Sequence, residues 1–179
     1  MKLISAIVCA TAAAGVSLTF SGTASATDVQ CTSTKGTDIT VIDGSTACRA
    51  ATDLLGEAKS FGIDGIGYAN ATAGARALGI GIAGGVGAGE GSGGIPLAIG
   101  VGQDAIALSS IDRDDVSPAA WPPVLAVSVA FEGSRASART AEASVICLGG
   151  GAFAWNSSTG DTCLSTPLGR WQTGAERLP

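Results

Sequence analysis

The sequence predicts an all-β domain whose centre is a β-solenoid or compact β-roll with glycine and alanine along one face. Three observations predict it: a glycine–alanine register of period two in residues 65–93, two flanking pairs of cysteines, and 27 glycines beside only 4% aromatic residues. A period of two is the side-chain period of a strand, because successive side chains point to opposite faces. A β-sandwich with one very thin layer is the alternative architecture.

The amino terminus predicts export from the cytoplasm. Lys2 precedes an apolar stretch from Leu3 to Phe20, and residues 21–26 are small and end in Ala-Ser-Ala, which is typical of a signal-peptide cleavage site. We expect residues 1–26 to be removed and residues 27–179 to form a single mature domain, secreted or held in the cell envelope. A leader that stays in the membrane as an anchor is the alternative.

Residues 27–59 are expected to form an amino-terminal unit closed by a disulfide. Ile39, Val41 and Ile42 lie between turn-forming residues and predict a strand. In residues 45–59 alanine and leucine recur at helical spacing after a possible cap at Ser45 or Thr46, which predicts a short helix.

Residues 60–110 form the glycine–alanine region. Every odd position from 65 to 93 is Gly or Ala, and after Gly94 the small residues move to even positions such as Ala98 and Gly100. Two faces of this kind can approach more closely than the roughly 10 Å usual for stacked sheets. We therefore expect two backbone layers in close contact, which leucine in place of Ala73 or Ala75 should overpack.

The larger side chains of this region define a candidate interaction face. Left uncovered, it would be an exposed apolar patch of the kind that binds partners. A strand over residues 124–131 is the internal candidate to cover it, and an unknown protein partner or a second copy is the alternative. The face consists of Ile66, Leu78, Ile80, Ile82 and Val86.

The remaining segments are a connector and a carboxy-terminal unit. Residues 111–123 are polar and rich in proline, which predicts an exposed loop. Residues 124–168 are expected to contain further strands, one of them near 143–148, together with the second disulfide.

Four cysteines remain after removal of the leader, and an even number in an exported chain predicts disulfides. They are Cys31, Cys48, Cys147 and Cys163. We favour Cys31–Cys48 and Cys147–Cys163, which close short loops at the two ends and contribute about 3 kcal/mol each in the chain-entropy model. A long-range pairing that ties the two ends together is the alternative.

Charge and composition argue against several classes of partner and site. Loss of Lys2 leaves nine cations against fifteen acids, a net charge of −6, which disfavours nucleic acid. No apolar run of the mature region reaches the roughly 20 residues of a transmembrane helix. Histidine is absent, so neither a Ser-His-Asp nor a Cys-His catalytic site can form.

Motifs for cofactors and metals are weak. Residues 79–84 and 89–94 both match the dinucleotide fingerprint, but no helical pattern follows either of them, so we expect no cofactor. Asp112, Asp114 and Asp115 could hold calcium, although an acidic surface loop is the simpler interpretation, and we expect no metal.

Paired carboxylates are the remaining route to catalysis. Glu57 with Asp64, or Glu132 with Glu142, would suit a hydrolase acting on envelope polymers. Nothing in the sequence brings either pair across a cleft. We favour a non-enzymatic binding or structural module, with the hydrolase as the alternative.

Two resemblances accompany these expectations. Residues 77–81 and 97–107 resemble the alanine–glycine strand repeats of trimeric autotransporter adhesin heads, which implies a left-handed β-roll for about a quarter of the chain. The whole layout resembles a family of small exported actinobacterial proteins of unknown function: a leader, a cysteine pair, Phe61-Gly62-Ile63-Asp64-Gly65 before the glycine–alanine run, and a later cysteine pair. That resemblance implies no activity.

Overall fold

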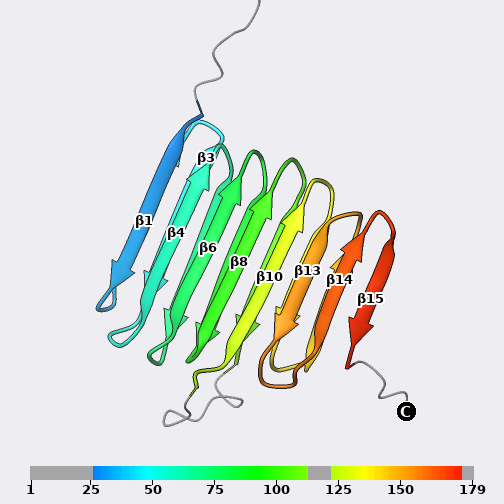
Figure 1. Cartoon of the computed structure of the whole chain (residues 1–179). Helices are drawn as coiled ribbons and strands as arrows, with labels where there is room; N and C mark the ends of the chain where they lie inside the picture. The colour runs from blue at the N-terminus through cyan, green and yellow to red at the C-terminus, as the bar shows by residue number, and fades with distance from the viewer. Residues whose placement is uncertain (1–25, 113–121, 175–179) are drawn as a thin grey trace, which may run out of the picture.

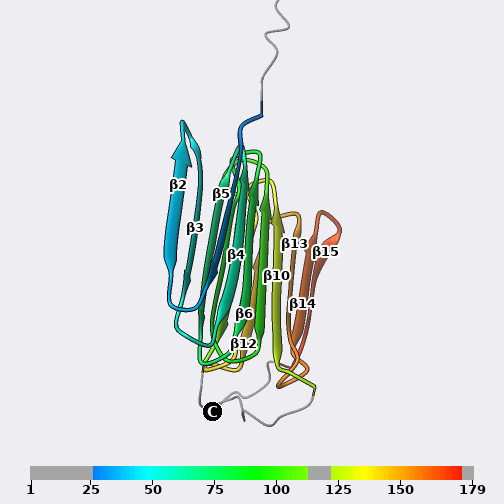
Figure 2. The same cartoon turned by 90° about the vertical axis from the view of Figure 1, so that its left-hand side faces the viewer.

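The computed structural model describes residues 26–112 and 122–174, and these residues form strands and turns without a helix. The strands make two sheets that lie face to face (Figures 1 and 2). Sheet A contains, in spatial order, β1 (Asp28–Thr34), β4 (Glu57–Ile63), β6 (Arg76–Ile82), β8 (Ile95–Val101), β10 (Leu125–Phe131), β13 (Ala152–Asn156), β14 (Thr162–Thr166) and β15 (Gly169–Thr173). Sheet B contains β12 (Ser144–Leu148), β11 (Arg135–Arg139), β9 (Ile106–Ile111), β7 (Val86–Ser92), β5 (Ile66–Thr72), β3 (Thr46–Thr52) and β2 (Asp38–Asp43).

The chain between β3 and β11 winds as a β-solenoid of about three turns, which confirms the predicted fold. Consecutive strands alternate between the sheets, and each strand pairs in parallel with the strand one coil later. Ile66 pairs with Val86, twenty residues on, and Glu57 pairs with Arg76, nineteen residues on. The step from Leu97 to Val127 is thirty residues, because the connection between β9 and β10 is longer than the others.

Glycine and alanine form the inner faces of both sheets, as the register predicts. Ala69, Ala71 and Ala98 are fully buried between the layers. A Cβ atom added to Gly89 would lie 2.6 Å from the carbonyl oxygen of Leu78 in the opposite sheet, and one added to Gly79 would overlap the carbonyl oxygen of Tyr68. The two backbones therefore touch almost directly, and only the smallest residues fit between them.

Turn length decides which positions face inward. The turns after β5 and β6 have three residues each (73–75 and 83–85), so a strand and its turn together span ten residues and the inner positions stay odd. The turn after β7 has only two residues, Gly93 and Gly94, which moves the inner positions to even numbers.

Two positions of the register, Ala73 and Ala83, lie in turns and not on the inner face. Ala73 lies in a turn, partly buried, with a positive φ of 51°, so leucine there would not fill the space between the sheets as expected. Ala75, the last residue of that turn, is fully buried and does lie in the narrow space.

Antiparallel strands and a disulfide close each end of the solenoid, as the flanking units of the prediction require. β1 and β2 run antiparallel to β4 and β3 at one end, and β12 to β15 run antiparallel to their neighbours at the other. Cys31 of β1 is bonded to Cys48 of β3, with Cα atoms 5.7 Å apart, and Cys147 of β12 to Cys163 of β14, with Cα atoms 5.9 Å apart. Both predicted pairings are confirmed, and each bond ties sheet A to sheet B.

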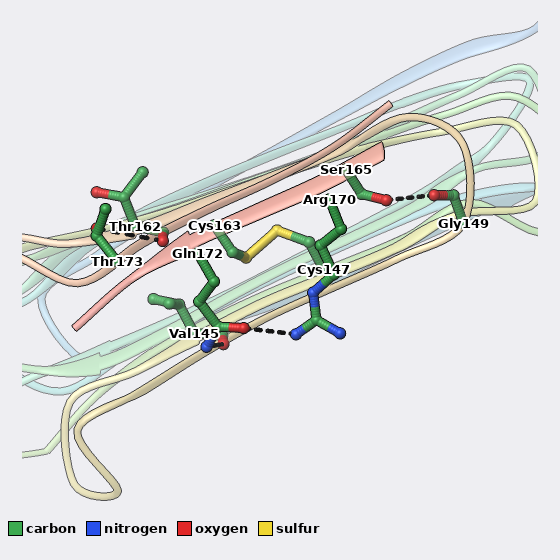
Figure 3. The surroundings of a disulfide bond; sticks show 9 residues. All are labelled: Val145, Cys147, Gly149, Thr162, Cys163, Ser165, Arg170, Gln172 and Thr173. Carbon is green, nitrogen blue, oxygen red and sulfur yellow. Dashed lines mark hydrogen bonds between the residues drawn. A yellow bond between two sulfur atoms is a disulfide. The ribbon is translucent and has the colours of Figure 1, made fainter. Parts of the chain in front are cut away.

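β15 completes the carboxy-terminal cap (Figure 3). Its Gln172 donates a hydrogen bond of 3.2 Å from Nε2 to the carbonyl oxygen of Val145 in the other sheet, beside the Cys147–Cys163 bond. Nη2 of Arg170 donates a hydrogen bond to Oε1 of Gln172. These polar side chains cover the end of the narrow core.

The predicted helix at residues 45–59 is wrong. The segment forms β3, a turn and the start of β4, with Cys48, Ala50 and Ala58 facing inward at strand spacing. Of its alanines, Ala50 and Ala58 face inward whereas Ala47 and Ala51 lie on the outer side of β3, so the helical spacing combines residues from both sides of the strand. The Asp53 side chain holds the turn by accepting hydrogen bonds of 2.8 Å from the Gly56 amide and 2.7 Å from the Ala73 amide.

The expected cover of the candidate face is also wrong. β10, at residues 125–131, lies beside β8 in the same sheet, with Val127 opposite Leu97, so it extends that sheet instead of covering it. The strand expected near 143–148 joins β11 in sheet B. Residues 1–25, most of the predicted leader, and residues 113–121 of the predicted loop lie outside the described residues. No described segment forms a helix that could cross a membrane.

Candidate interaction surface

The five residues of the candidate face lie on two opposite surfaces of the molecule. Leu78, Ile80 and Ile82 are on β6 and point outward from sheet A. Ile66 and Val86 form a cross-strand pair on β5 and β7 and point outward from sheet B. The structure brings together the first three and, separately, the last two, because consecutive strands belong to different sheets.

Sheet A carries a continuous apolar surface on its outer side, which we call the apolar face. It extends from β4 across β6, β8 and β10 to β15, and the strand register arranges its side chains in three rows. The central row contains Phe61, Ile80, Ile99, Val129, Phe153, Leu164 and Trp171. Beside it lie Leu78, Leu97, Val127 and Trp155 in one row, and Ile63, Ile82, Val101 and Phe131 in the other.

Neighbouring side chains half-bury most of this face, because a flat sheet packs its outward residues against one another. The most exposed members lie toward its margins: Ile63 is 39% exposed, Leu164 41%, Phe131 50% and Trp171 53%. A contiguous apolar surface that extends over seven strands is unusual on a protein that acts alone, and surfaces of this kind often bind partners.

Polar residues bound the apolar face on the side of β1. The outward positions of β1 are Asp28, Gln30, Thr32 and Thr34. At the adjoining corner Glu57 lies 3.2 Å from Lys59 and 3.8 Å from Arg76, and all three side chains are at least one-third exposed. Ion pairs this exposed contribute little to stability, so these charges act mainly as a hydrophilic border.

Sheet B has a more polar outer side. Arg49 lies 5.9 Å above the ring of Tyr68 and makes a bidentate contact with Asp38, with Nη2 and Oδ2 2.7 Å apart. The hydrogen bond from Arg49 lowers the pKa of the Asp38 carboxyl, and the same bond raises the pKa of Arg49. Asn70 and Glu90 share a hydrogen bond of 3.0 Å farther along. The two outer surfaces therefore differ in chemistry, although both belong to one solenoid.

The predicted carboxylate pairs do not meet. Glu57 and Asp64 lie at opposite ends of β4, and Glu132 and Glu142 lie at opposite ends of β11. Asp64 and Glu132 instead line one cavity of about 530 Å³ among the turns at one end of the coils.

The two carboxylates of that cavity come from strands that are not neighbours. Asp64 follows β4 and Glu132 follows β10, three strand positions apart in sheet A. At about 4.8 Å per strand their backbones are separated by roughly 14 Å, so both side chains would have to lean toward each other to bring the carboxyl groups within the roughly 9.5 Å of glycoside hydrolysis. The backbone spacing therefore does not favour paired-acid hydrolysis.

The glycines of the dinucleotide-like motifs have a structural role. Gly79 and Gly81 of the first motif, and Gly89 and Gly91 of the second, all lie on the inner faces against the other sheet. A phosphate could not approach these backbones, because the opposite strand already does. Within residues 26–112 and 122–174, no cluster of three or more His, Cys, Asp or Glu is arranged to hold a metal ion. Of the three aspartates proposed for calcium, Asp114 and Asp115 lie outside the described residues.

The carboxy-terminal part of the apolar face is a feature that sequence reasoning missed. Phe153 and Trp155 alternate with the buried Ala152 and Ala154, which is the pattern of a strand with one inward and one outward side. Because the region is only five residues long, its alternation is easy to overlook, and the pairing of β13 with β10 is not visible in sequence.

The profile of one protein family, described as a family of unknown function (DUF6764), matches residues 1–166. The chain belongs to this family. The DUF6764 match covers the whole solenoid, all four bonded cysteines and every strand except β15. No curated protein and no solved structure matches the chain significantly. The expectation of a family without an established function is confirmed, whereas the likeness to adhesin heads stays a resemblance of sequence.

Proposed function

We propose that this protein is a non-enzymatic binding module, secreted or held in the cell envelope, that binds through the apolar face of sheet A. The single observation that carries the proposal is that face: an outward surface of aliphatic and aromatic side chains that nothing in the described chain covers. A protein gains nothing in stability by leaving so much apolar area in water, whereas a partner that covers it gains the hydrophobic free energy of burial.

The construction of the fold supports a binding role over a catalytic one. The two backbones touch along the whole solenoid, which leaves little freedom to reshape a surface for chemistry, and neither predicted pair of carboxylates is brought together. A rigid and flat surface is suited to contact over a large area. Two disulfides, which persist in oxidising compartments, support a location outside the cytoplasm.

Dye binding tests whether this face binds apolar ligands. Ile99 and Val129 are cross-strand neighbours at its centre, and Ala88 and Leu108 are the matching neighbours on the outer side of sheet B. The chain, expressed with its own amino terminus in a secreting host, should enhance the fluorescence of an anilinonaphthalene sulfonate dye at nanomolar protein concentration. The Ile99→Lys/Val129→Lys variant should lose most of that signal, and the Ala88→Lys/Leu108→Lys variant should keep it.

Near-ultraviolet circular dichroism of each variant would confirm that the fold is intact before the dye signals are compared. A wild-type protein that is monomeric and binds no dye would contradict the proposal. Equal loss of signal in the two variants would also contradict it, because the sheet B substitutions leave the apolar face unchanged.

The location has its own test. If residues 1–26 are the leader that the sequence predicts, amino-terminal sequencing of protein recovered from the medium or the cell envelope should begin at Thr27. Recovery of the whole chain from the cytoplasm, with free thiols in place of disulfides, would be the contrary result.

A further inference from the structure

We propose that the occupant of the apolar face is a second copy of the same chain, packed sheet A against sheet A about a two-fold axis that runs along β10. The inference rests on the proposed function, because it concerns the same surface, and it adds the identity of the partner. β10 is the middle strand of the apolar face, with three strands of the face on either side. An axis along it therefore places every strand of the face over a strand of the second copy.

The size of the apolar face agrees with what a stable dimer needs. Four of its strands have seven residues and three have five, and strands rise about 3.3 Å per residue and lie about 4.8 Å apart. The outer surface of these seven strands therefore measures roughly 700 Å², of which the apolar face is the greater part, and standard interfaces bury about 800 Å² on each partner. A single small ligand would leave most of this area in water.

The chemistry of the face suits a copy of itself. In the two-fold arrangement each part of the surface meets the same kind of surface, and the rows from β6 to β13 contain only Leu, Ile, Val, Phe and Trp at the positions nearest the axis. A highly charged partner would find no counter-charges there. Two such sheets would pack about 10 Å apart, as in an aligned β-sandwich.

The position of the charged corner selects the direction of the axis. An axis along β10 places β4 of one copy over β15 of the other, so that Lys59 approaches Thr173 of the second copy at the margin. An axis across the strands would place Lys59 against Ile63 of the second copy, which buries a charge beside an apolar side chain. The first arrangement keeps the charges of the corner at the rim of the interface.

Sedimentation velocity over nanomolar to high-micromolar concentrations tests the proposal with the chain released by a secreting host. The wild-type protein should reach twice the mass of one chain as the concentration rises. The Ile99→Lys/Val129→Lys variant should stay at the mass of one chain, and the Ala88→Lys/Leu108→Lys variant should associate as the wild type does. The dye signal per mole of wild-type protein should fall over the same range of concentration in which the mass doubles.

Hydroxyl-radical footprinting of the wild-type protein keeps the test independent of whether the variants fold. At high concentration Leu97, Ile99, Val127 and Val129 should be protected relative to low concentration, whereas Leu108 on sheet B should react equally at both. Protection of Leu108 instead would overturn the proposed interface, even if the protein were dimeric.

The remaining outcomes separate this inference from the proposed function. A wild-type monomer at every concentration that nevertheless binds the dye through sheet A would overturn the dimer and leave the binding module standing. If that monomer also bound phosphatidylcholine vesicles, and the Ile99→Lys/Val129→Lys variant did not, the occupant would be a lipid surface. A monomer that binds neither dye nor vesicles would overturn both proposals.

Discussion

Gly79 shows how little space the interior of this protein leaves for a side chain. Its backbone belongs to strand β6 and does not have a positive φ, so its conformation would suit any residue. What excludes other residues is distance, because the carbonyl oxygen of Tyr68 in the opposite sheet occupies the place of a Cβ atom. The same holds for Gly87 against Ile80 and for Gly100 against Val86.

Replacing Gly79 with alanine should therefore destabilise the protein. The methyl group has to push two backbones apart, and overpacking of this kind typically costs about 1–3 kcal/mol, with a higher cost where backbone meets backbone. Urea unfolding followed by circular dichroism should show a lower midpoint with an unchanged slope.

Gly150→Ala is the matched control, since the nearest atom to its added Cβ is Cγ of Pro167 at 3.8 Å and its φ is not positive. The free energy of unfolding should change by less than about 0.5 kcal/mol. Equal destabilisation by the two alanines would show that contact between the backbones is not what limits the interior.

Ala75→Leu is the corresponding prediction at an alanine position. Ala75 is fully buried, so a leucine side chain should lower the free energy of unfolding by about 1–3 kcal/mol or more. Ala88→Leu, on the half-buried outer side of β7, should leave the melting temperature almost unchanged when both variants are compared by thermal unfolding. An unchanged melting temperature for Ala75→Leu would mean that the space between the sheets is open to water.

Most inner residues could be predicted from sequence alone, because a period of two identifies the face on which a residue lies. The prediction was wrong at Ala73 and Ala83, where turn geometry replaces strand geometry. The positive φ of Ala73 is uncommon for a residue other than glycine, and the period-two pattern does not indicate it.

Strands at the two ends depend on the disulfides more than the central strands do. β12 and β14 have five residues each, bury few large side chains and are joined across the sheets by Cys147–Cys163. The bond limits the conformations of the unfolded chain and fixes the cap over the last coil.

Replacing both Cys147 and Cys163 with serine should lower the free energy of unfolding by about 3 kcal/mol, the chain-entropy value for a loop of this length. Amide hydrogen exchange should accelerate in β12 to β15 and stay slow in β5 to β8. The Cys31→Ser/Cys48→Ser variant is the matched comparison, with the loosened strands at the amino-terminal end. Uniform acceleration along the whole chain in either variant would contradict a local role for the bonds.

The β2–β3 hairpin should loosen in acid. Asp38 has a lowered pKa in the folded state because it accepts hydrogen bonds from Arg49, so the pair stabilises the hairpin at neutral pH. That contribution is present above the ordinary pKa of an aspartate and is lost as the pH falls through the lowered value. In an NMR titration the Asp38 carboxyl should titrate below the ordinary aspartate range.

Arg49→Gln should return the Asp38 titration to the ordinary range and remove the acid dependence of amide exchange in β2. Asp38→Asn should also remove that dependence. A titration of Asp38 that is the same with and without the Arg49 guanidinium would exclude the pair as the cause.

Strand positions at the amino-terminal end were harder to predict than those in the centre. Ala47, Ala50, Ala51, Leu54 and Leu55 follow a helical spacing, and alanine favours helices in isolation. Tertiary contacts override that preference, because Cys48 and Ala50 are needed on an inner face and Cys48 must reach Cys31. The disulfide pairing of the flanking cysteines was predictable from their even number and short spacing, because bond formation between cysteines does not depend on secondary-structure propensity.

The solenoid as a whole is built from nearly interchangeable coils. Each coil contributes one strand to each sheet and contacts mainly the coils before and after it, so stability is close to a sum over coils and their junctions. The long connection between β9 and β10 shows that a turn can be lengthened without disturbing the parallel pairing on either side of it.

Removal of one whole coil should therefore leave a folded protein. Deletion of residues 66–85 joins Gly65 to Val86, which then takes the place of Ile66 beside Ala47, and Ile99 takes the place of Ile80 beside Phe61. Calorimetry should show one cooperative transition at a lower temperature than in the full chain, with both disulfides formed.

Deletion of residues 70–88 is the control. It joins Ala69 to Gly89 within a strand, so that Glu90, an outward residue of β7, takes the inward place of Ala71. It should fail to give a cooperative transition although it removes fewer residues. If both deletions behaved alike, the coils would not be the units of stability.

The distribution of apolar side chains over the whole molecule could not be predicted from sequence. The register shows that Leu78 and Val86 both point outward, but which of two sheets a strand joins depends on the path of the chain through three dimensions. For that reason the candidate face divides between two surfaces. The continuous apolar face depends on the pairing of β10 with both β8 and β13, which are distant in sequence.

The interior of backbone against backbone also has a calorimetric consequence. The heat capacity increment of unfolding comes chiefly from hydrating apolar surface, at about +0.45 cal/K/mol per Å², and an interior of glycine and alanine holds little such surface. The increment per residue should then fall below the usual 12–15 cal/mol/K, and the stability curve should be broad and shallow. Such a protein would keep nearly constant stability through wide swings of temperature, in cold as well as in heat.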